Sequence, residues 1–350
     1  MNGIPLNPRS RALVLGASGG IGSEVARQLR EAGWQVRALR RGGAPSPASS
    51  SAPGVQATNP ALPEAEHIEW IDGDALSRDA VLRAAQGCAL IVHAVNPPGY
   101  RRWAQVVLPM IDNTLAAAAA TGATVVLPGT VYNYGPDTFP VLREDAPQQP
   151  LTRKGAIRVE LERRMQAASE RGVRSIVVRA GDFFGPRVGN SWFAQGLVKA
   201  GAPVQVVREP SARGIGHAWS YVPDVARTML ELIARRDTLP AFATFHMAGH
   251  WDANGMQLSE AICRVARGHG LEPQRKPFPW TFVRAVSPFV TTLRELMEMR
   301  YLWREPLQLD NARLVAELGR EPHTPLDEAV EATLMGLGCL GAQERMQKAA

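Results

Sequence analysis

The residues whose types and spacing point most directly to chemistry are three glycines near the amino terminus, Gly16, Gly19 and Gly22. They follow an apolar run and precede an amphipathic stretch. The first permits a tight turn, the second lets the backbone approach a phosphate, and the third lets the following helix pack close to the strand. The helix also presents free N–H groups and its positive dipole end to an anion. The pattern predicts a dinucleotide pyrophosphate bound by Gly16, Ser18, Gly19, Gly20, Ile21 and Gly22.

Two arginines bear on which dinucleotide is bound. Arg40 and Arg41 follow the expected second strand, where a carboxylate would bind the ribose 2′-OH of NAD. A guanidinium is instead a good planar partner for a 2′-phosphate, so we expect NADP rather than NAD. The alternative is that the pair forms a solvated loop edge. Asp74, after the expected third strand, is placed to accept a hydrogen bond from the adenine amino group.

The elements that must position these residues alternate along the first half of the chain. Apolar runs predict strands at residues 11–15, 35–39, 67–71, 89–94, 124–127 and 174–179, and amphipathic patterns predict helices at 21–32, 78–86, 103–120 and 155–171. This alternation is typical of an α/β protein with a Rossmann-type, doubly wound parallel sheet. Residues 42–66, rich in Ala, Pro and Ser, are expected to form a long loop.

The pattern changes after residue 181. We expect helices at residues 190–201, 222–235, 258–267 and 326–337, a strand at 243–248, and an aromatic segment at 279–303 that packs in a core or forms an apolar substrate wall. The dinucleotide-binding domain would span residues 9–186, with 215–248 returning to it. Residues 187–214 and 249–345 would form a smaller, mainly helical substrate-binding cap over the carboxyl ends of the strands.

Composition excludes several classes of function. The 350 residues carry a net charge of +6, but no basic run is interleaved with aromatics, so no nucleic-acid partner is expected. The three cysteines, Cys88, Cys263 and Cys339, have no metal-ligand spacing and form no even disulfide set, so we expect no metal. No stretch has the length of a membrane span and no apolar signal core begins the chain, so we expect a cytoplasmic protein without a membrane partner.

Six separated segments together resemble the extended branch of the short-chain dehydrogenase/reductase superfamily, which includes nucleotide-sugar epimerases and dehydratases. The resemblance covers roughly residues 9–249 and rests on the Gly-x-x-Gly-x-x-Gly turn and on residues 72–74, 92–94, 130–135, 179–186 and 221–226. It implies a cofactor groove lined by Ala94, with Asn96 as a further candidate or an ordinary turn residue. It also implies hydride transfer to or from a small molecule, and a homodimer formed through the helices near residues 103–120 and 155–171.

The sequence departs from that family in the catalytic motif. The family uses a Tyr to move a proton, a Lys four residues later to hold the nicotinamide ribose, and a Ser or Thr to polarise the substrate oxygen. Thr130 fits the polarising position, but no Tyr-x-x-x-Lys follows Pro150. Counting back from Glu162 aligns Arg158 with the Lys and Lys154 with the Tyr.

Three interpretations of this departure remain open. Lys154 and Arg158 share a helix face, so Lys154 could supply the proton while Arg158 holds the ribose. Alternatively, both residues form a basic helix face or simple cofactor contacts, or Tyr132 or Tyr134 supplies the proton. The expected function is an NADP(H)-dependent oxidoreductase acting on a carbonyl or hydroxyl of a small, partly apolar molecule. The alternatives are a non-catalytic dinucleotide-binding sensor or scaffold, and a nucleotide-sugar epimerase or dehydratase with NAD.

Overall fold

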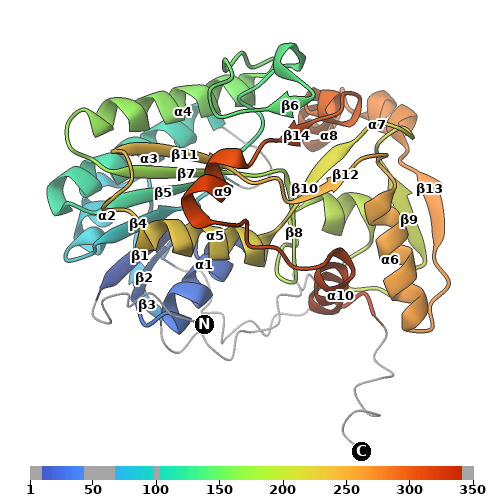
Figure 1. Cartoon of the computed structure of the whole chain (residues 1–350), viewed down its shortest axis with the longest axis horizontal. Helices are drawn as coiled ribbons and strands as arrows, with labels where there is room; N and C mark the ends of the chain where they lie inside the picture. The colour runs from blue at the N-terminus through green and yellow to red at the C-terminus, as the bar shows by residue number, and fades with distance from the viewer. Residues whose placement is uncertain (1–9, 43–67, 98–102, 341–350) are drawn as a thin grey trace, which may run out of the picture.

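A seven-stranded sheet in the order β11-β7-β5-β4-β1-β2-β3 forms the centre of the computed structural model, which describes residues 10–42, 68–97 and 103–340 (Figure 1). Every pairing between neighbours in this sheet is parallel. The strands are β1 (Arg11–Leu15), β2 (Gln35–Arg40), β3 (Ile68–Asp72), β4 (Leu90–His93), β5 (Thr124–Gly129), β7 (Ser175–Arg179) and β11 (Phe242–His246). Strand order reverses between β1 and β4, which is where such sheets bind ligands. The predicted Rossmann-type class is confirmed.

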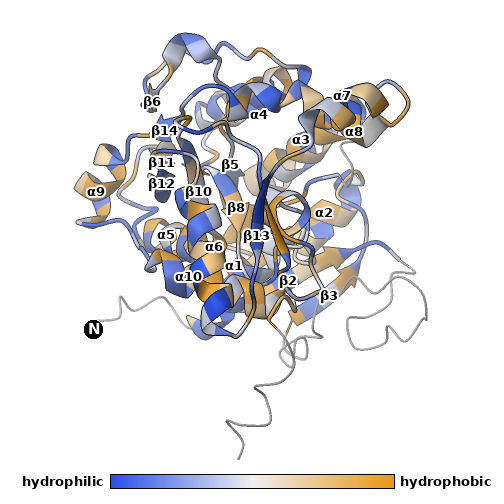
Figure 2. Cartoon of the chain, turned by 90° about the vertical axis from the view of Figure 1, so that its right-hand side faces the viewer, coloured by the Kyte–Doolittle hydropathy of each residue, from blue (hydrophilic) through white to orange (hydrophobic). Residues whose placement is uncertain are grey.

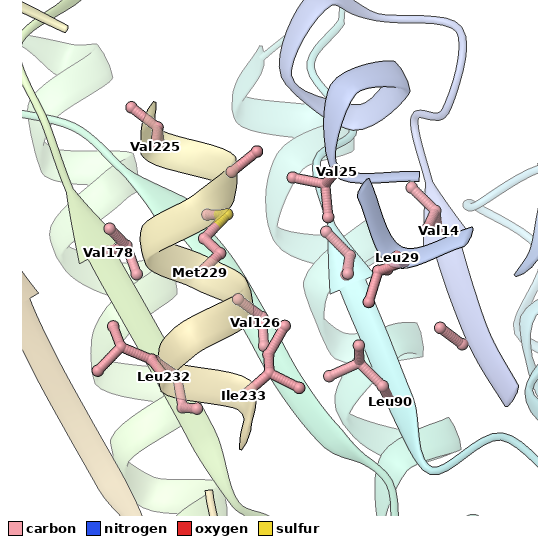
Figure 3. Packing of buried hydrophobic residues seen from close by; sticks show 14 of the residues in the cluster. Val14, Val25, Leu29, Leu90, Val126, Val178, Val225, Met229, Leu232 and Ile233 are labelled. Atoms are coloured by element: carbon pink, nitrogen blue, oxygen red, sulfur yellow. The ribbon is translucent and has the colours of Figure 1, made fainter. Parts of the chain in front are cut away.

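Helices cover both faces of the sheet because each buried strand is apolar on both sides. On β1, Ala12 and Val14 face α1 (Gly20–Glu31) and α5 (Val222–Ala234), whereas Leu13 and Leu15 face the opposite layer. Figure 3 shows Val25 and Leu29 of α1 and Met229 of α5 in the first of these clusters. The opposite layer contains α2 (Arg78–Ala85), α3 (Trp103–Thr121) and α4 (Arg153–Ser169).

The remaining residues form a second group of elements beside the sheet. Helices α6 (Gln257–Gly268), α7 (Trp280–Val286), α8 (Thr291–Glu298) and α10 (Leu326–Gly336) belong to it, whereas α9 (Ala312–Leu318) packs against β11 of the central sheet. Three small sheets join them, formed by β8 (Asp182–Phe184) with β10 (His217–Tyr221) and β12 (His250–Asp252), by β9 (Val206–Glu209) with β13 (Gln274–Pro277), and by β6 (Val141–Leu142) with β14 (Gln308–Leu309). Figure 2 shows β13 as a hydrophilic strand, and all four of its residues are exposed.

One expectation for this region is wrong and a second holds only in part. The helix expected at residues 190–201 is only a π-helical turn, Phe193–Leu197. The backbone is already extended at Val198, with φ −120° and ψ 179°, so the turn ends after Leu197, and Gly196 within it lowers helix propensity. The aromatic segment is also not uniformly core: Trp303 is buried, but Phe289 is 88% exposed, because it follows the short surface helix α7. The loop expected at residues 42–66 lies, except for residue 42, outside the described residues.

Candidate cofactor and catalytic site

The glycine-rich turn joins β1 to α1 in a conformation that requires two of its glycines. Gly16 has a φ of +88°, and a Cβ atom there would lie 2.5 Å from the carbonyl oxygen of Ala94. A Cβ at Gly22 would lie 2.1 Å from the carbonyl oxygen of Gly16. The Gly19 N–H donates to that same oxygen over 2.9 Å. The turn therefore packs α1 directly against the end of β1 and the residue after β4.

The first turn of α1 is open to an anion. Gly19 is the N-cap residue, no side chain caps the helix, and the first turn carries no acidic residue. Within the part of the chain that the structure describes, a Cβ at Gly19 would meet only the carbonyl oxygen of Gly16, at 3.3 Å, and Ser18 and Gly19 are exposed. Since uncapped N–H groups at a helix N-terminus bind anions, this end of α1 fits a dinucleotide pyrophosphate.

One buried carboxylate lies further along the same helix. Glu24 is 4% exposed and accepts hydrogen bonds from Arg27, Gln28 and Arg187. Burial raises the pKa of Glu24, but these three hydrogen bonds outweigh it and lower that pKa. The carboxylate is therefore ionised and neutralised by its own partners. Arg187 ties α1 to the segment after β8.

The other predicted cofactor residues lie at the carboxyl ends of neighbouring strands, because all strands of the sheet run parallel. Arg40 ends β2, is partly exposed, and donates from Nε to Asp72 Oδ1 at the end of β3, over 3.0 Å. Arg41 is exposed. Asp74 Oδ1 accepts from the backbone N–H of Leu76 over 2.9 Å. Arg40 therefore already has one carboxylate partner, Asp72. A 2′-phosphate would have to share the Arg40 guanidinium with it.

Ala94 and Asn96 follow β4 at this same edge. The Ala94 N–H donates to the carbonyl oxygen of Leu15 over 2.9 Å, which extends the β1–β4 pairing by one residue. Asn96 is exposed. The backbone of Ala94 is what a side chain at Gly16 would strike. The structure thus places the glycine-rich turn against the residues after β4.

Thr130 follows β5 and rests on a buried polar network. Arg179 Nη1 donates to the Thr130 carbonyl oxygen over 2.7 Å. The Arg179 guanidinium also forms a two-bond ion pair with Glu162 of α4, at 2.9 and 2.7 Å, and both side chains are buried. Gln148 then links Glu162 to Asn133, whose Oδ1 accepts from Thr130 Oγ1 over 3.4 Å. The network therefore holds the Thr130 backbone in place from the buried side.

Lys154 lies in the first turn of α4, 2% exposed, and its ammonium is held by α8. Its Nζ lies 2.7 Å from Glu295 Oε2, 3.2 Å from Glu298 Oε2 and 2.9 Å from the Glu295 carbonyl oxygen. An ammonium has three N–H donors, so these three acceptors can take all of them. In this arrangement Lys154 has no donor left for a substrate oxygen.

Arg158 is one turn further along α4 and lies beside β4. It is 9% exposed, with its guanidinium carbon 5.0 Å from the ring centroid of Trp103. Burial, and then the charge of Arg158, lower the pKa of His93 to about 3. The Nδ1 of His93 is 2.8 Å from Thr114 Oγ1. His93 is therefore a neutral, hydrogen-bonded core residue.

Tyr134, one of the two tyrosines considered as proton donors, lies in the interior, and so does His217 of β10. Tyr134 is fully buried beneath the Arg179 guanidinium, and burial raises the pKa of its hydroxyl. His217 uses both ring nitrogens, one 2.8 Å from Asp182 Oδ2 and the other 3.2 Å from the Leu302 carbonyl oxygen. Tyr132 is half-buried, and its N–H donates to Thr130 Oγ1 over 3.4 Å.

The sequence profile described as "NAD dependent epimerase/dehydratase family" matches residues 12–248. The chain belongs to this family. Membership supports a nicotinamide dinucleotide as the cofactor, in agreement with the open end of α1, and an enzyme kind that includes oxidoreductases and epimerases. No curated protein sequence matches the chain.

Several solved structures share the fold of this family member. MoeE5, in complex with UDP-glucose and NAD, is 19% identical, covers 97% of this chain and 100% of its own, and has a TM-score of 0.69. A UDP-glucose 4-epimerase from Thermotoga maritima, with UDP-glucose, is 18% identical, covers 93% and 98%, and has a TM-score of 0.67. WbmH of Bordetella bronchiseptica, in complex with NAD+, is 16% identical, covers 94% and 98%, and has a TM-score of 0.64. At these identities the likeness concerns the fold alone.

Several residues of this site escaped the sequence-based prediction. Glu295 and Glu298 hold Lys154, and Gln148 and Asn133 complete the network at Thr130. None of them stands in a spacing that marks a site, because their partners lie on other elements. Glu162 served only as a reference point for aligning Lys154 and Arg158 with the family.

Among the described residues, no helix is both long and apolar enough to span a membrane.

Proposed function

We propose that this family member binds NADP(H) and transfers a hydride between the nicotinamide and a carbonyl or hydroxyl carbon of a small molecule. The observation that carries the proposal is the open positive end of α1 beside two arginines, Arg40 and Arg41, at the end of β2. A bound nicotinamide would supply or accept the hydride. Arg41 is exposed and Arg40 partly so, which suits contact with a 2′-phosphate.

The chain's own residues would then divide the remaining work. Thr130 would donate to the substrate oxygen, and Arg158 would donate to the ribose hydroxyls but would not exchange a proton near neutral pH. Lys154 is the proposed proton donor. It can act only after α8 gives up at least one of its acceptors, since Glu295 and Glu298 occupy the ammonium in this arrangement.

A second candidate function is a dinucleotide-binding sensor or scaffold without turnover. The specific observation in its favour is the same clamp, because a lysine fixed by two carboxylates is a structural anchor for α8. A third candidate is a nucleotide-sugar epimerase with NAD. The neighbours that hold NAD and UDP-sugars favour it, whereas Arg40 at the end of β2 favours NADP.

Cofactor choice is tested by titrating the protein with NADPH and NADH and following nicotinamide fluorescence. We expect tighter binding of NADPH, and in Arg40→Asp a loss of roughly tenfold to a hundredfold in affinity for NADPH but little change for NADH, because one charge-assisted hydrogen bond is removed. The control is Arg267→Asp, the same charge change at an exposed position of α6. Equal losses for both nucleotides in Arg40→Asp would refute the assignment of the 2′-phosphate site.

Turnover is tested with NADPH and a panel of aldehydes and ketones. Lys154→Met should abolish any reduction while NADPH affinity stays within a few-fold. The double change Glu295→Gln with Glu298→Gln should raise turnover if Lys154 donates the proton, because it removes the carboxylates that hold the ammonium. Retained turnover in Lys154→Met would exclude Lys154 from proton transfer. Tight NADPH binding with no turnover across the panel would favour the sensor or scaffold.

A homodimer through α3 and α4 also remains a prediction. These two helices line a surface groove of about 340 Å³ that includes Leu115 and Ala119 of α3 and Ala168 of α4. Arg164 and Asp112 form an ion pair across the same pair of helices. Light scattering on the purified protein would measure the mass, and a monomer at all concentrations would contradict the prediction.

A further inference from the structure

Three side chains that commonly bind metals meet outside the cofactor site. Asp224 lies in the first turn of α5, His250 begins β12, and His323 stands in the segment between α9 and α10. One ligand atom from each of the three lies within 4.8 Å of the other two. The three residues are far apart in the sequence, so no local motif marks them.

His250 is a buried imidazole with an unused nitrogen. It is 9% exposed, and its Nε2 has no hydrogen-bond partner within the described part of the chain. A buried polar atom without a partner lowers the stability of the fold, so a ligand bound at this nitrogen would be stabilising. A neutral imidazole is the form that binds a metal ion.

Asp224 is oriented by neighbours and keeps room for one more. It is 3% exposed; its Oδ2 accepts from the Thr324 N–H over 2.7 Å, and its Oδ1 accepts from Thr324 Oγ1 over 2.8 Å and from Arg227. A carboxylate offers about four lone-pair positions, so Oδ2 retains one. Hydrogen bonds of this kind orient carboxylates that bind metals.

We propose that Asp224, His250 and His323 bind one divalent transition-metal ion of the borderline class, such as Zn²⁺. Two imidazoles and a carboxylate are a common ligand set for that class, and water would complete the coordination. Tetrahedral binding needs ligand atoms about 3.3 Å apart, given metal–ligand bonds of about 2.0–2.1 Å. His323 is exposed, and its ring centroid is 4.4 Å from that of His250, so it can make the small inward movement. The bound ion would fasten the segment before α10 to α5 and β12.

Arg227 sets the affinity of this site. Its guanidinium forms an ion pair with Asp224 and would repel an incoming metal ion. The Arg227 side chain is 45% exposed, however, and can turn into solvent. Replacing Arg227 with Gln therefore removes a competing cation without touching a ligand. We therefore expect Arg227→Gln to raise the affinity for the metal ion and the loss of a ligand to lower it.

The experiment is calorimetric titration of the full chain, without an affinity tag and after treatment with a chelator, with Zn²⁺ and separately with Mg²⁺. We expect one Zn²⁺ per chain and no Mg²⁺ binding, because Mg²⁺ requires oxygen ligands in octahedral geometry. His323→Ala, at an exposed position that should leave folding intact, is expected to weaken Zn²⁺ binding by at least about tenfold. His269→Ala, at the end of α6, is the matched control and should bind like the parent protein. Arg227→Gln should bind more tightly.

Cobalt gives a second readout that does not depend on a variant. Co²⁺ bound by two imidazoles and a carboxylate should show the visible absorption of a four- or five-coordinate site, and His323→Ala should lose it. The proposal is overturned if the parent protein binds no Zn²⁺, if Zn²⁺ binds equally well to His323→Ala, or if Mg²⁺ competes on equal terms.

Discussion

Replacing Glu162 with Gln should strongly destabilise the protein, because it leaves the buried guanidinium of Arg179 without its counter-charge. The two side chains are 6% and 1% exposed and share two hydrogen bonds, at 2.9 and 2.7 Å. Arg179 cannot lose its proton in response. Its other partners, His246 Nε2 and the Thr130 carbonyl oxygen, are neutral and do not compensate for the missing charge.

Removal of one partner from a buried ion pair costs about 3–5 kcal/mol of the free energy of unfolding. A glutamine side chain fits the same space and keeps one oxygen as an acceptor, so we expect a loss near the lower value, about 3 kcal/mol. Because Arg179 also holds the Thr130 backbone, NADPH-dependent turnover, if present, should fall further than stability alone explains.

The assay is equilibrium unfolding in urea, followed by tryptophan fluorescence and by circular dichroism. The control is Glu160→Gln on the same helix, since Glu160 also pairs with two arginines, Arg163 and Arg164, but at the surface. Surface pairs contribute little, so this control should unfold almost like the parent protein. A loss in Glu162→Gln no larger than in Glu160→Gln would refute the reasoning that the buried pair holds α4 to β7.

Two further predictions follow from buried groups. Gly22→Ala should sharply weaken NADPH binding and lower the melting temperature, because the added Cβ would lie 2.1 Å from the Gly16 carbonyl oxygen. The control is Gly268→Ala, where the added Cβ meets nothing within 4 Å in the described part of the chain, so this variant should be harmless. Equal behaviour of the two variants would contradict the packing argument. Burial, and then Arg158, lower the pKa of His93 to about 3, so the stability from its neutral burial is lost as pH falls below roughly 6.5, at about 1.4 kcal/mol per pH unit. His93→Gln should flatten the dependence of unfolding free energy on pH by that amount between pH 6 and 4, and an unchanged slope would exclude this role.

The central sheet could be predicted from the sequence because its signals are local. Its central strands are apolar runs next to a turn, whereas β2 and β3 alternate apolar and polar residues, and β1 and β7 lie within a residue of the expected ranges. The short strands β8, β9, β10 and β12 were not predicted as such. Their pairing depends on partners far along the chain: Trp219 of β10, for example, pairs with Asp182 and with His250. No property of three to five residues in isolation reveals such pairing.

The same distinction divides the site. Gly16 and Gly22 were identified from spacing, since the turn and the helix that it begins are consecutive in the chain. The acceptors of Lys154 were not, because Glu295 is 141 residues away and on another helix. Residues 89–94 were expected to form an apolar strand, and His93 is buried there, 2% exposed. Local patterns therefore predicted the glycine-rich turn, whereas the partners of Lys154 depend on how α8 docks.

That docking links any ligand of Lys154 to the position of α8. The N–H groups that would contact a substrate are the same ones that bind Glu295 and Glu298, so a ligand and α8 compete for them. By linkage, a ligand that takes Lys154 weakens the attachment of α8, and a change that strengthens this attachment weakens the ligand by the same factor. The Arg153 N–H adds to the attachment through Glu298 Oε1, at 2.9 Å. On the proposed function, the α4–α8 contact would have to open before Lys154 could reach a ligand. A reductase would then open it at each turnover, and a sensor would report cofactor binding by its opening.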